Sequence, residues 1–262
     1  EYTFDEQLGY ISLNQSLNND EVLAVSFQYS YNGEIFQVGE FSDDGIVSVD
    51  QSQNSVTRKS LVVKLLKSNI NNVRQPIWKL MMKNIYNLGA YQLSMDDFRL
   101  NIYYNDPSPL NYIKAVDNNT WPSGLDKKRL LNVFELDRLN INGNLQEDGD
   151  GFFDAIDGIT IIKNKGLLVF PKEEPFGKFL FEKLRNNQNE DYNDPTTYNQ
   201  NQLKYVYNEM YTFGKTSAEK FIEKNKFNIR GKYKSTSSND GINTGEFNIA
   251  QGSIVVSAGG RI

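Results

Sequence analysis

The feature of the sequence that most constrains the fold is a stretch near the N-terminus in which apolar and polar residues alternate. In the first half of EVLAVSFQYSYNGEIFQVGEF, residues 21–41, an apolar or aromatic side chain recurs at every second position. Asn32 and Gly33 interrupt the alternation, and this dipeptide is typical of the type I′ turn that joins two antiparallel strands. The stretch therefore predicts a β-hairpin. The apolar face of its first half is formed by Leu23, Val25, Phe27, Tyr29 and Tyr31.

Other strands are predicted by runs of apolar and β-branched residues. SLVVKLLKS, residues 60–68, is apolar on both faces and predicts a strand that is buried on both sides or nearly so. GITIIKNKGLLVF, residues 158–170, predicts a second hairpin that closes near Asn164–Gly166. The remaining predicted strands are FRLNIYY, FNIRGKYKS and GSIVVSAGG, residues 98–104, 227–235 and 252–260.

Helical periodicity is clearest in PIWKLMMKNIYNLG, residues 76–89. Pro76 can occupy the first turn, and Gly89 suits a left-handed C-terminal cap. Between them Ile77, Met81, Ile85 and Leu88 form an apolar stripe. A short helix or turn is predicted at DKKRLLNVF, residues 126–134, and three helices are predicted within residues 176–186, 200–213 and 216–226.

This order of elements predicts an α+β fold with mostly antiparallel strands, hairpins and several helices. The length of 262 residues and a hydrophobic content of 39% are sufficient for one large or two modest domains. We interpret residues 1–262 as one α+β unit cut from a longer chain, because the start lacks an initiator Met and both ends are strand-like. Two lobes are the alternative: a hairpin-rich lobe over residues 1–114 and a second lobe over 125–262 with the acidic loop, a hairpin, helices and terminal strands.

The composition excludes several classes of chemistry. The chain contains neither Cys nor His, so disulfides, thiolate nucleophiles, Ser-His-Asp triads and His-ligated zinc are ruled out within it. The formal net charge is -5, and the basic residues are scattered, so nucleic acid is not expected as a partner. No apolar run reaches the roughly 20 residues that a membrane-spanning helix needs. No transmembrane segment is therefore expected in this piece.

The run NLQEDGDGFFDAID, residues 144–157, combines five carboxylates with two glycines. Its spacing is close to that of an EF-hand calcium loop, in which alternate side chains converge on one hard cation and a glycine permits a sharp turn. Calcium is therefore the candidate cofactor. The candidate ligands are the side chains of Gln146, Asp148, Asp150, Asp154 and Asp157 and the backbone carbonyl of Phe152.

Two departures weaken this match. The first loop position is Gln146 rather than Asp, and the last is Asp157, which is one methylene shorter than the usual bidentate Glu. The alternative is a solvated Asp-Gly turn that leads into the strand predicted at 158–162. Calcium is favoured by the mutual repulsion of so many carboxylates within one turn, which a cation would neutralise.

Long and distinctive phrases occur from the first residues of the chain to the last. They are EYTFDEQLGYISLN, DEVLAVSFQYSYNGEIFQVGEFSDDG, LVVKLLKS, WKLMMKNIYNLGAYQLSMDDFRLNIYY, FELDRLN, DGDGFFDAIDGITI, GLLVFPKEEPFG and GSIVVSAGGR. Together they resemble the SprA family, also called Sov, the giant outer-membrane proteins of the type nine secretion system of Bacteroidetes. That family forms a large β-barrel translocon that exports folded cargo and, in gliding bacteria, surface adhesins.

The resemblance implies a soluble, non-catalytic insertion in that barrel protein, which shapes the channel or docks partner subunits or secreted cargo. It implies a location at the cell outer membrane, with this part facing the cell surface, the channel lumen or the periplasm. It also implies an ordered acidic loop at Asp148, Asp150, Asp154 and Asp157, with a bound cation as one explanation of the order.

Two other functions compete with this interpretation. A surface adhesion or glycan-binding module is suggested by the 15 Tyr and 16 Phe residues and by the calcium candidate. A hydrolase would use Glu173 and Glu174 of PKEEPFG as its acid/base pair. Because neighbouring side chains of an extended segment point in opposite directions, we expect no catalysis at this pair.

Overall fold

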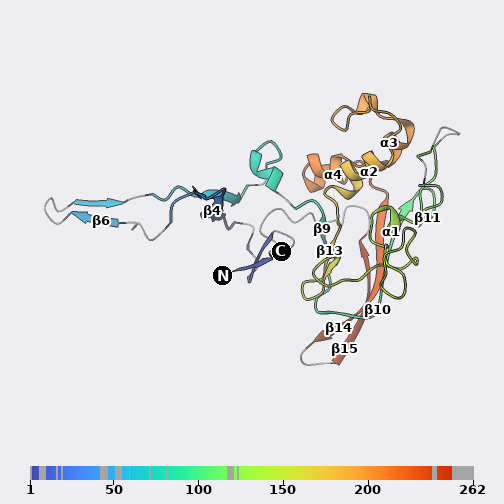
Figure 1. The fold of residues 1–262 in the computed structure, drawn as a ribbon, viewed down its shortest axis with the longest axis horizontal. Coiled ribbons are helices and arrows are strands. Elements are labelled where there is room, and N and C mark those ends of the chain that lie inside the picture. Colours follow the sequence, from blue (N-terminus) through green and yellow to red (C-terminus); the bar gives the residue numbers. More distant parts are fainter. Residues whose placement is uncertain are drawn as a thin grey trace. The chain divides into compact units, whose positions relative to one another are not determined.

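The structure is a computed structural model. It describes residues 2–5, 10–15, 17–18, 20–41, 47–50, 55–58, 60–70, 72–80, 82–116, 121–122, 124–237 and 241–249. These residues form two compact units, unit 1 within residues 2–80 and unit 2 within residues 82–249. The elements are antiparallel strands and short helices (Figure 1), so the predicted α+β fold is confirmed. The two lobes considered from the sequence divide at residues 115–124, whereas the compact units divide at residue 81.

The strands of unit 1 form four separate two-stranded antiparallel sheets. The predicted hairpin is confirmed: Tyr31 pairs with Glu34 across the turn, and Asn32 and Gly33 have φ angles of 52° and 84°, as a type I′ turn requires. The sheets are β1 (Tyr2–Asp5) with β2 (Tyr10–Leu13), β3 (Leu23–Val25) with β8 (Lys64–Lys67), β4 (Phe27–Tyr31) with β5 (Glu34–Val38), and β6 (Val47–Asp50) with β7 (Ser55–Arg58).

Unit 1 has no buried apolar side chain among its residues of described burial, and its buried residues there are Ser12 and Lys67. The strand predicted over residues 60–68 is an example of this lack of apolar burial. It is shorter than expected, and the prediction that both faces are buried is wrong, because Val62 is 69% exposed and Leu65 is 41% exposed. β8 belongs to a two-stranded sheet, and such a ribbon has no second layer of its own to cover it.

The helix predicted over residues 76–89 is wrong beyond its first turn. Pro76–Leu80 forms the short 3₁₀ helix η2, and Ile85–Asn87 forms strand β9. β9 pairs with β13 (Leu167–Val169), and this distant pairing overrides the local helical pattern. Gly89 does have the expected left-handed φ angle, 73°, but it follows a strand.

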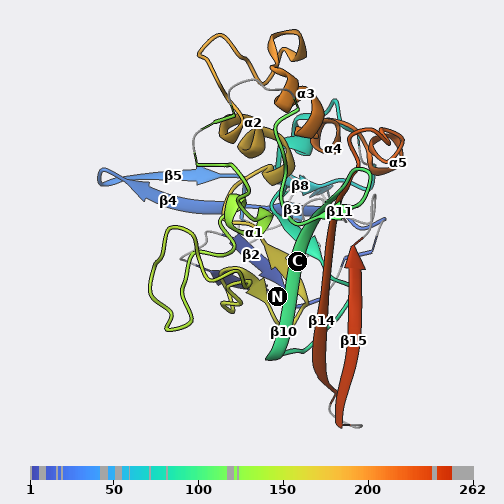
Figure 2. The ribbon, with the colours of Figure 1, turned by 90° about the vertical axis from the view of Figure 1, so that its right-hand side faces the viewer.

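Unit 2 contains a four-stranded sheet in the order β11-β10-β14-β15 and a three-stranded sheet in the order β12-β13-β9. Figure 2 shows β10, β14 and β15 side by side. The strands predicted at 98–104 and 227–235 and the hairpin at 158–170 are confirmed, whereas the strand predicted at 252–260 lies outside the described residues. The strands are β10 (Leu93–Asn105), β11 (Pro109–Leu110), β12 (Ile161–Ile162), β14 (Phe227–Ser237) and β15 (Gly241–Ile249).

The helices of unit 2 are short, and all but the 3₁₀ helix at Pro195–Thr197 lie where a helix or turn is predicted. The helix predicted over residues 200–213 is divided into two. Asn199 begins α3 with a capping box, because its side chain accepts from the Gln202 amide at 3.0 Å and its amide donates to the Gln202 side chain at 2.9 Å. No helix among the described residues is long and apolar enough to cross a bilayer. The helices are α1 (Leu130–Val133), the π-helix η3 (Pro175–Phe179), α2 (Leu180–Lys183), the 3₁₀ helix η4 (Pro195–Thr197), α3 (Gln200–Tyr205), α4 (Glu209–Thr212) and α5 (Lys215–Ala218).

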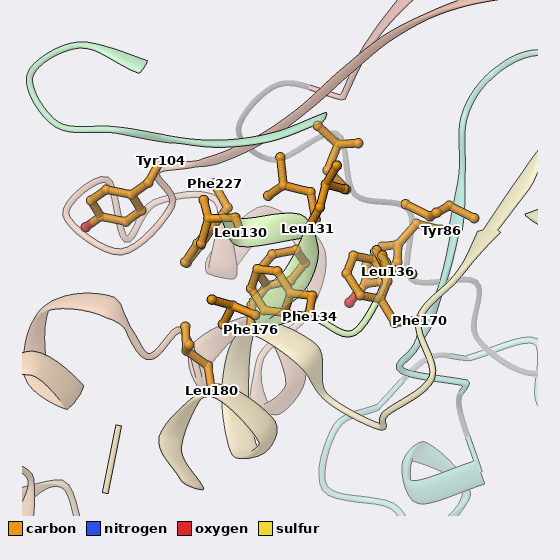
Figure 3. Packing of buried hydrophobic residues seen from close by; sticks show 14 of the residues in the cluster. Tyr86, Tyr104, Leu130, Leu131, Phe134, Leu136, Phe170, Phe176, Leu180 and Phe227 are labelled. Atoms are coloured by element: carbon orange, nitrogen blue, oxygen red, sulfur yellow. The ribbon is translucent and has the colours of Figure 1, made fainter. Parts of the chain in front are cut away.

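The core of unit 2 is a cluster of aromatic rings beside α1 (Figure 3). Phe134, which directly follows α1, lies with its ring centroid 5.7 Å from Phe170, 5.0 Å from Phe176 and 5.9 Å from Phe227. The four side chains are at most 2% exposed, and they come from four different segments. Edge-to-face packing of this kind stabilises aromatic clusters beyond the burial of their area.

We expect Phe134→Ala to lower the free energy of unfolding by about 3–5 kcal/mol, since it leaves a cavity among three rings. Urea unfolding followed by circular dichroism measures this loss. Tyr91→Ala is the control, because Tyr91 is 63% exposed and exposed substitutions change stability by about 0.5 kcal/mol or less. Equal losses in the two variants would contradict the assignment of Phe134 to the core.

Candidate functional site

The acidic loop follows α1 as a long irregular segment, drawn in yellow-green in Figure 2, where it runs outward on the side away from β10. Its first part is a small turn in which Leu139 and Leu145 form an antiparallel bridge. The side-chain oxygen of Asn140 accepts from the amides of Asn142 at 2.9 Å and Asn144 at 3.0 Å. These bonds order the turn without any helix or strand.

The buried side chain of Asp137 binds the backbone of the acidic run. Its side chain is fully buried, Oδ1 accepts from the amide of Asp150 at 2.9 Å, and Oδ2 accepts from the amide of Gly151 at 3.0 Å. Gly149 has a φ angle of 62°, and a Cβ at this position would lie 1.9 Å from Asp137 Oδ1. A residue with a side chain therefore cannot pass so close to the carboxylate.

Asp154 makes the matching contact in the opposite direction. Its Oδ2 accepts from the amides of Arg138 at 2.6 Å and Leu139 at 3.0 Å, and its own amide donates to the carbonyl of Leu136 at 2.9 Å. Asp137 thus accepts from the backbone amides of residues 150 and 151. Asp154 accepts from the backbone amides of residues 138 and 139, which follow Asp137 in the chain. We call this pair, Asp137 and Asp154, the carboxylate clamp.

Asn132 connects the clamp to α1. The side chain of this buried residue of α1 donates to the carbonyls of Asp137 at 2.8 Å and Glu147 at 3.0 Å. The loop is therefore fixed by the same short helix that begins the aromatic core. Sequence reasoning missed both Asp137 and Asn132. Asp137 stands between two other charged positions, Glu135 and Arg138, in FELDRL, residues 134–139, so no local signal in the sequence distinguishes it.

The first three candidate ligands make local contacts. The amide of Gln146 donates to the carbonyl of Arg138 at 2.8 Å. Asp148 is exposed and lies 3.5 Å from the Lys128 ammonium, and Asp150 Oδ1 accepts from the amide of Phe152 at 2.9 Å. Asp148 and Asp150 both line a pocket of about 510 Å³, which they share with Lys127, Lys128 and Arg129.

The later candidate ligands point to other partners. Asp154 belongs to the clamp, and Asp157 contacts Lys163 twice, accepting from its amide at 3.1 Å and pairing with its ammonium at 3.1 Å. Phe152 is 57% exposed, and its ring lies 5.3 Å from the guanidinium of Arg99. The six residues named from the sequence are thus close in the chain, but their side chains do not converge on one point.

This arrangement decides how well the loop fits calcium, which prefers six to eight oxygen ligands around one centre. Within the part of the chain that the structure describes, no group of three or more acidic side chains could hold a metal ion. A calcium cage would require Asp154 and Asp157 to exchange their present partners for the ion. Calcium at this loop stays a prediction.

Burial raises the pKa of the Asp137 carboxyl above its ordinary value. The two backbone amides of Asp150 and Gly151 oppose this rise, and the negative charges of Asp150 and Asp154 add to it. A carboxylate that is desolvated in this way is costly unless its hydrogen bonds are retained. The ionised form of Asp137 therefore depends on the hydrogen bonds from the amides of Asp150 and Gly151.

The other pair considered for chemistry, Glu173 and Glu174, is not arranged as a facing pair of free acids. Glu173 is exposed, whereas Glu174 is buried, has a φ angle of 48°, and forms an ion pair with Lys83. Its second oxygen accepts from the Tyr192 hydroxyl at 2.8 Å. Burial and the adjacent Glu174 charge raise the pKa of Tyr192 well above its ordinary value. These contacts give Glu174 a structural role between three segments.

Comparisons with known proteins leave the family open. No protein-family model matches the chain, and a search of curated proteins finds no significantly similar sequence. The resemblance to the SprA family therefore stays a prediction.

Removing the clamp carboxylate tests its role in stability. We expect Asp137→Ala to lower the free energy of unfolding by about 1–3 kcal/mol, because two partly buried amides lose a charged acceptor. Asp148→Ala is the matched control, since the Asp148 side chain is 82% exposed, and it should change stability by about 0.5 kcal/mol or less. Chemical unfolding of both variants gives the comparison, and a smaller loss in Asp137→Ala than in the control would contradict the clamp.

The raised pKa of Asp137 gives this loss a definite pH dependence. The folded state binds the proton of Asp137 more tightly than the unfolded state, where the pKa is about 3.9. The contribution of Asp137 to stability is therefore largest below that value and falls as pH rises through the folded pKa. We expect the stability difference between the wild type and Asp137→Ala to shrink from acidic to neutral pH. Urea unfolding at several pH values measures it, and a difference that grows with pH would mean a lowered pKa.

The calcium prediction is tested by thermal unfolding in chelator and in excess calcium, with magnesium as control. Calcium at about 100 times its dissociation constant adds about 2.7 kcal/mol to the free energy of unfolding, which for a chain of this size raises the midpoint by roughly 5 to 10 °C. Asp150→Ala should abolish the rise. An unchanged midpoint in the wild type would exclude a calcium site and leave the carboxylate clamp as the source of order.

Proposed function

We propose that this chain is a non-catalytic domain of an outer-membrane protein-export channel of the type nine secretion system. In this proposal it shapes the channel or docks partner subunits or secreted cargo. The name of the system depends on the resemblance of long phrases spread over the whole chain. The docking role is supported by the exposure of apolar side chains in unit 1.

Unit 1 exposes many large apolar side chains that a self-sufficient domain would bury. A two-stranded hairpin is marginally stable in water, and stability normally comes from burial of apolar area. Because the residues of described burial in unit 1 include no buried apolar side chain, its hairpins need a further surface to pack on. The most exposed examples are Tyr2, Phe4, Tyr31, Ile35, Val62 and Ile70.

The β4–β5 hairpin is the best-defined part of this exposed surface. Tyr29 and Phe36 are cross-strand neighbours, their rings stack at 5.2 Å between centroids, and they are 49% and 38% exposed. The opposite face carries the cross-strand pairs Gln28–Gln37 and Ser30–Ile35. One face thus carries the aromatic pair, while Ile35 is the apolar residue among the four on the other, so the aromatic face is the better candidate for packing on a partner.

The test is secretion by bacteria that carry the full-length parent protein with altered β4–β5 faces. We expect Tyr29→Ser with Phe36→Ser to reduce the amount of cargo released to the medium, because the docking face loses its apolar area. Gln28→Ser with Gln37→Ser changes the opposite face of the same hairpin and should leave secretion near the wild-type level. Immunoblots of the parent protein exclude a difference in its abundance.

Equal secretion by both double variants and the wild type would contradict a docking role for this hairpin. The genomic reading frame offers an independent check of the export proposal. It should continue on both sides of this chain into alternating strands of about ten residues with lipid-facing apolar positions. A frame that encodes a signal peptide and an isolated stop codon beside the chain would overturn the proposal.

Glycan binding is the second candidate, and the exposed aromatic face of β4–β5 is the observation that favours it, because sugar rings stack on aromatic side chains. A glycan array separates the two functions. Binding that is lost in Tyr29→Ser with Phe36→Ser would favour the glycan function, and an array without any hit at high protein concentration would remove it.

A further inference from the structure

The tip of the acidic loop exposes apolar side chains to an unusual degree. Ile141 is 89% exposed and Leu145 is 80% exposed, the highest values for large apolar residues among those that the structure describes. Every residue of the tip from Ile141 to Asp148 is exposed. Large apolar side chains this exposed within five residues of one loop are candidates for a contact surface.

The charged residues of the loop that follow these side chains in the chain are acidic. Glu147, Asp148 and Asp150 follow Leu145 closely and are exposed. No Lys or Arg occurs in the chain between Leu139 and Ile162, although five carboxylates do. Lys128 lies 3.5 Å from Asp148, and Glu147 adds a further exposed negative charge beside Leu145. An apolar tip with such a mainly acidic flank is complementary to an apolar recess with a basic border.

The tip is ordered by contacts that do not bury it. The Asn140 side chain holds the turn, and the carboxylate clamp holds the run that follows. A side chain that is already fixed before binding loses less conformational entropy on association than one on a free loop. The loop thus presents Ile141 and Leu145 from a fixed base.

We infer that this tip is a docking epitope for a polypeptide partner whose apolar pocket is bordered by Lys or Arg side chains. Ile141 and Leu145 enter the pocket, and Glu147 and Asp148 pair with the basic border. A second copy of this chain is a poor occupant, because two acidic tips repel each other. The inference rests on the proposed function as a docking domain and names the chemistry of the partner.

The binding test uses the 262-residue chain and a labelled amphipathic helical peptide of Leu and Lys as a defined probe. Fluorescence anisotropy measures the affinity. We expect Ile141→Ser with Leu145→Ser to weaken binding by more than about tenfold, because both apolar side chains then no longer bury apolar area in the pocket. Glu147→Lys with Asp148→Lys should weaken binding as strongly. A peptide of Leu and Glu should not bind.

Ile159→Ser is the matched control, since Ile159 is 50% exposed in the same irregular segment and lies beyond the tip; it should bind the Leu–Lys peptide like the wild type. All these positions are exposed, so thermal melts should coincide. Equal binding by the wild type and both tip variants, or equal loss in the Ile159→Ser control, would overturn the inference.

The same variants in the full-length parent protein separate this inference from the proposed function. A secretion defect in the tip variants, together with loss of peptide binding, supports both. Secretion that depends on the β4–β5 face, with peptide binding that does not depend on the tip, overturns the inference and leaves the proposed function standing. Peptide binding by the tip, with secretion unaffected by either set of variants, supports the epitope and contradicts the export function.

Discussion

The packing of Phe134 against Phe170, Phe176 and Phe227 is the interaction on which unit 2 depends. These rings come from α1, the end of β13, η3 and β14, so one contact region joins both sheets to the helices. α1 has four residues, which is too short for a helix to be stable alone. The buried rings therefore fix α1, and α1 in turn fixes the start of the acidic loop.

The acidic loop shows how a segment without helix or strand can still be ordered. Backbone amides that are not in a helix or strand need other acceptors, and here carboxylates replace the carbonyls of a neighbouring strand. Asp137 accepts from the amides of residues 150 and 151, late in the loop, and Asp154 accepts from the amides of residues 138 and 139, at its start. Two of the other carboxylates are exposed: Asp148 lies 3.5 Å from the Lys128 ammonium, and Asp150 accepts from the Phe152 amide.

What the sequence could predict was decided by the range of the interactions involved. The hairpin at Asn32–Gly33 depends on local turn chemistry, and it was predicted correctly. The helix over residues 76–89 failed because β9 forms its hydrogen bonds with β13, far along the chain. The predicted burial of residues 60–68 was wrong because an apolar pattern does not reveal whether another sheet or helix packs on the strand.

The site follows the same rule. The acidic run was found from its spacing, but the partners of Asp154 and Asp157 were not, since spacing says nothing about competing amides and ammonium groups. Asp137 was missed because its role arises only when residues 150 and 151 fold back onto it. Residues whose partners lie far along the chain were therefore the ones whose structural role the sequence did not predict.

In our proposal, unit 2 carries its own core while unit 1 depends on a partner surface. Amide hydrogen exchange of the isolated chain, followed by mass spectrometry, tests this claim most directly, since exchange protection reports local stability. We expect the paired amides of β4 and β5 to exchange quickly and those of β10 and β14 to exchange slowly. Protection of β4 and β5 equal to that of β10 and β14 would contradict the claim and would mean that unit 1 is stable without a partner.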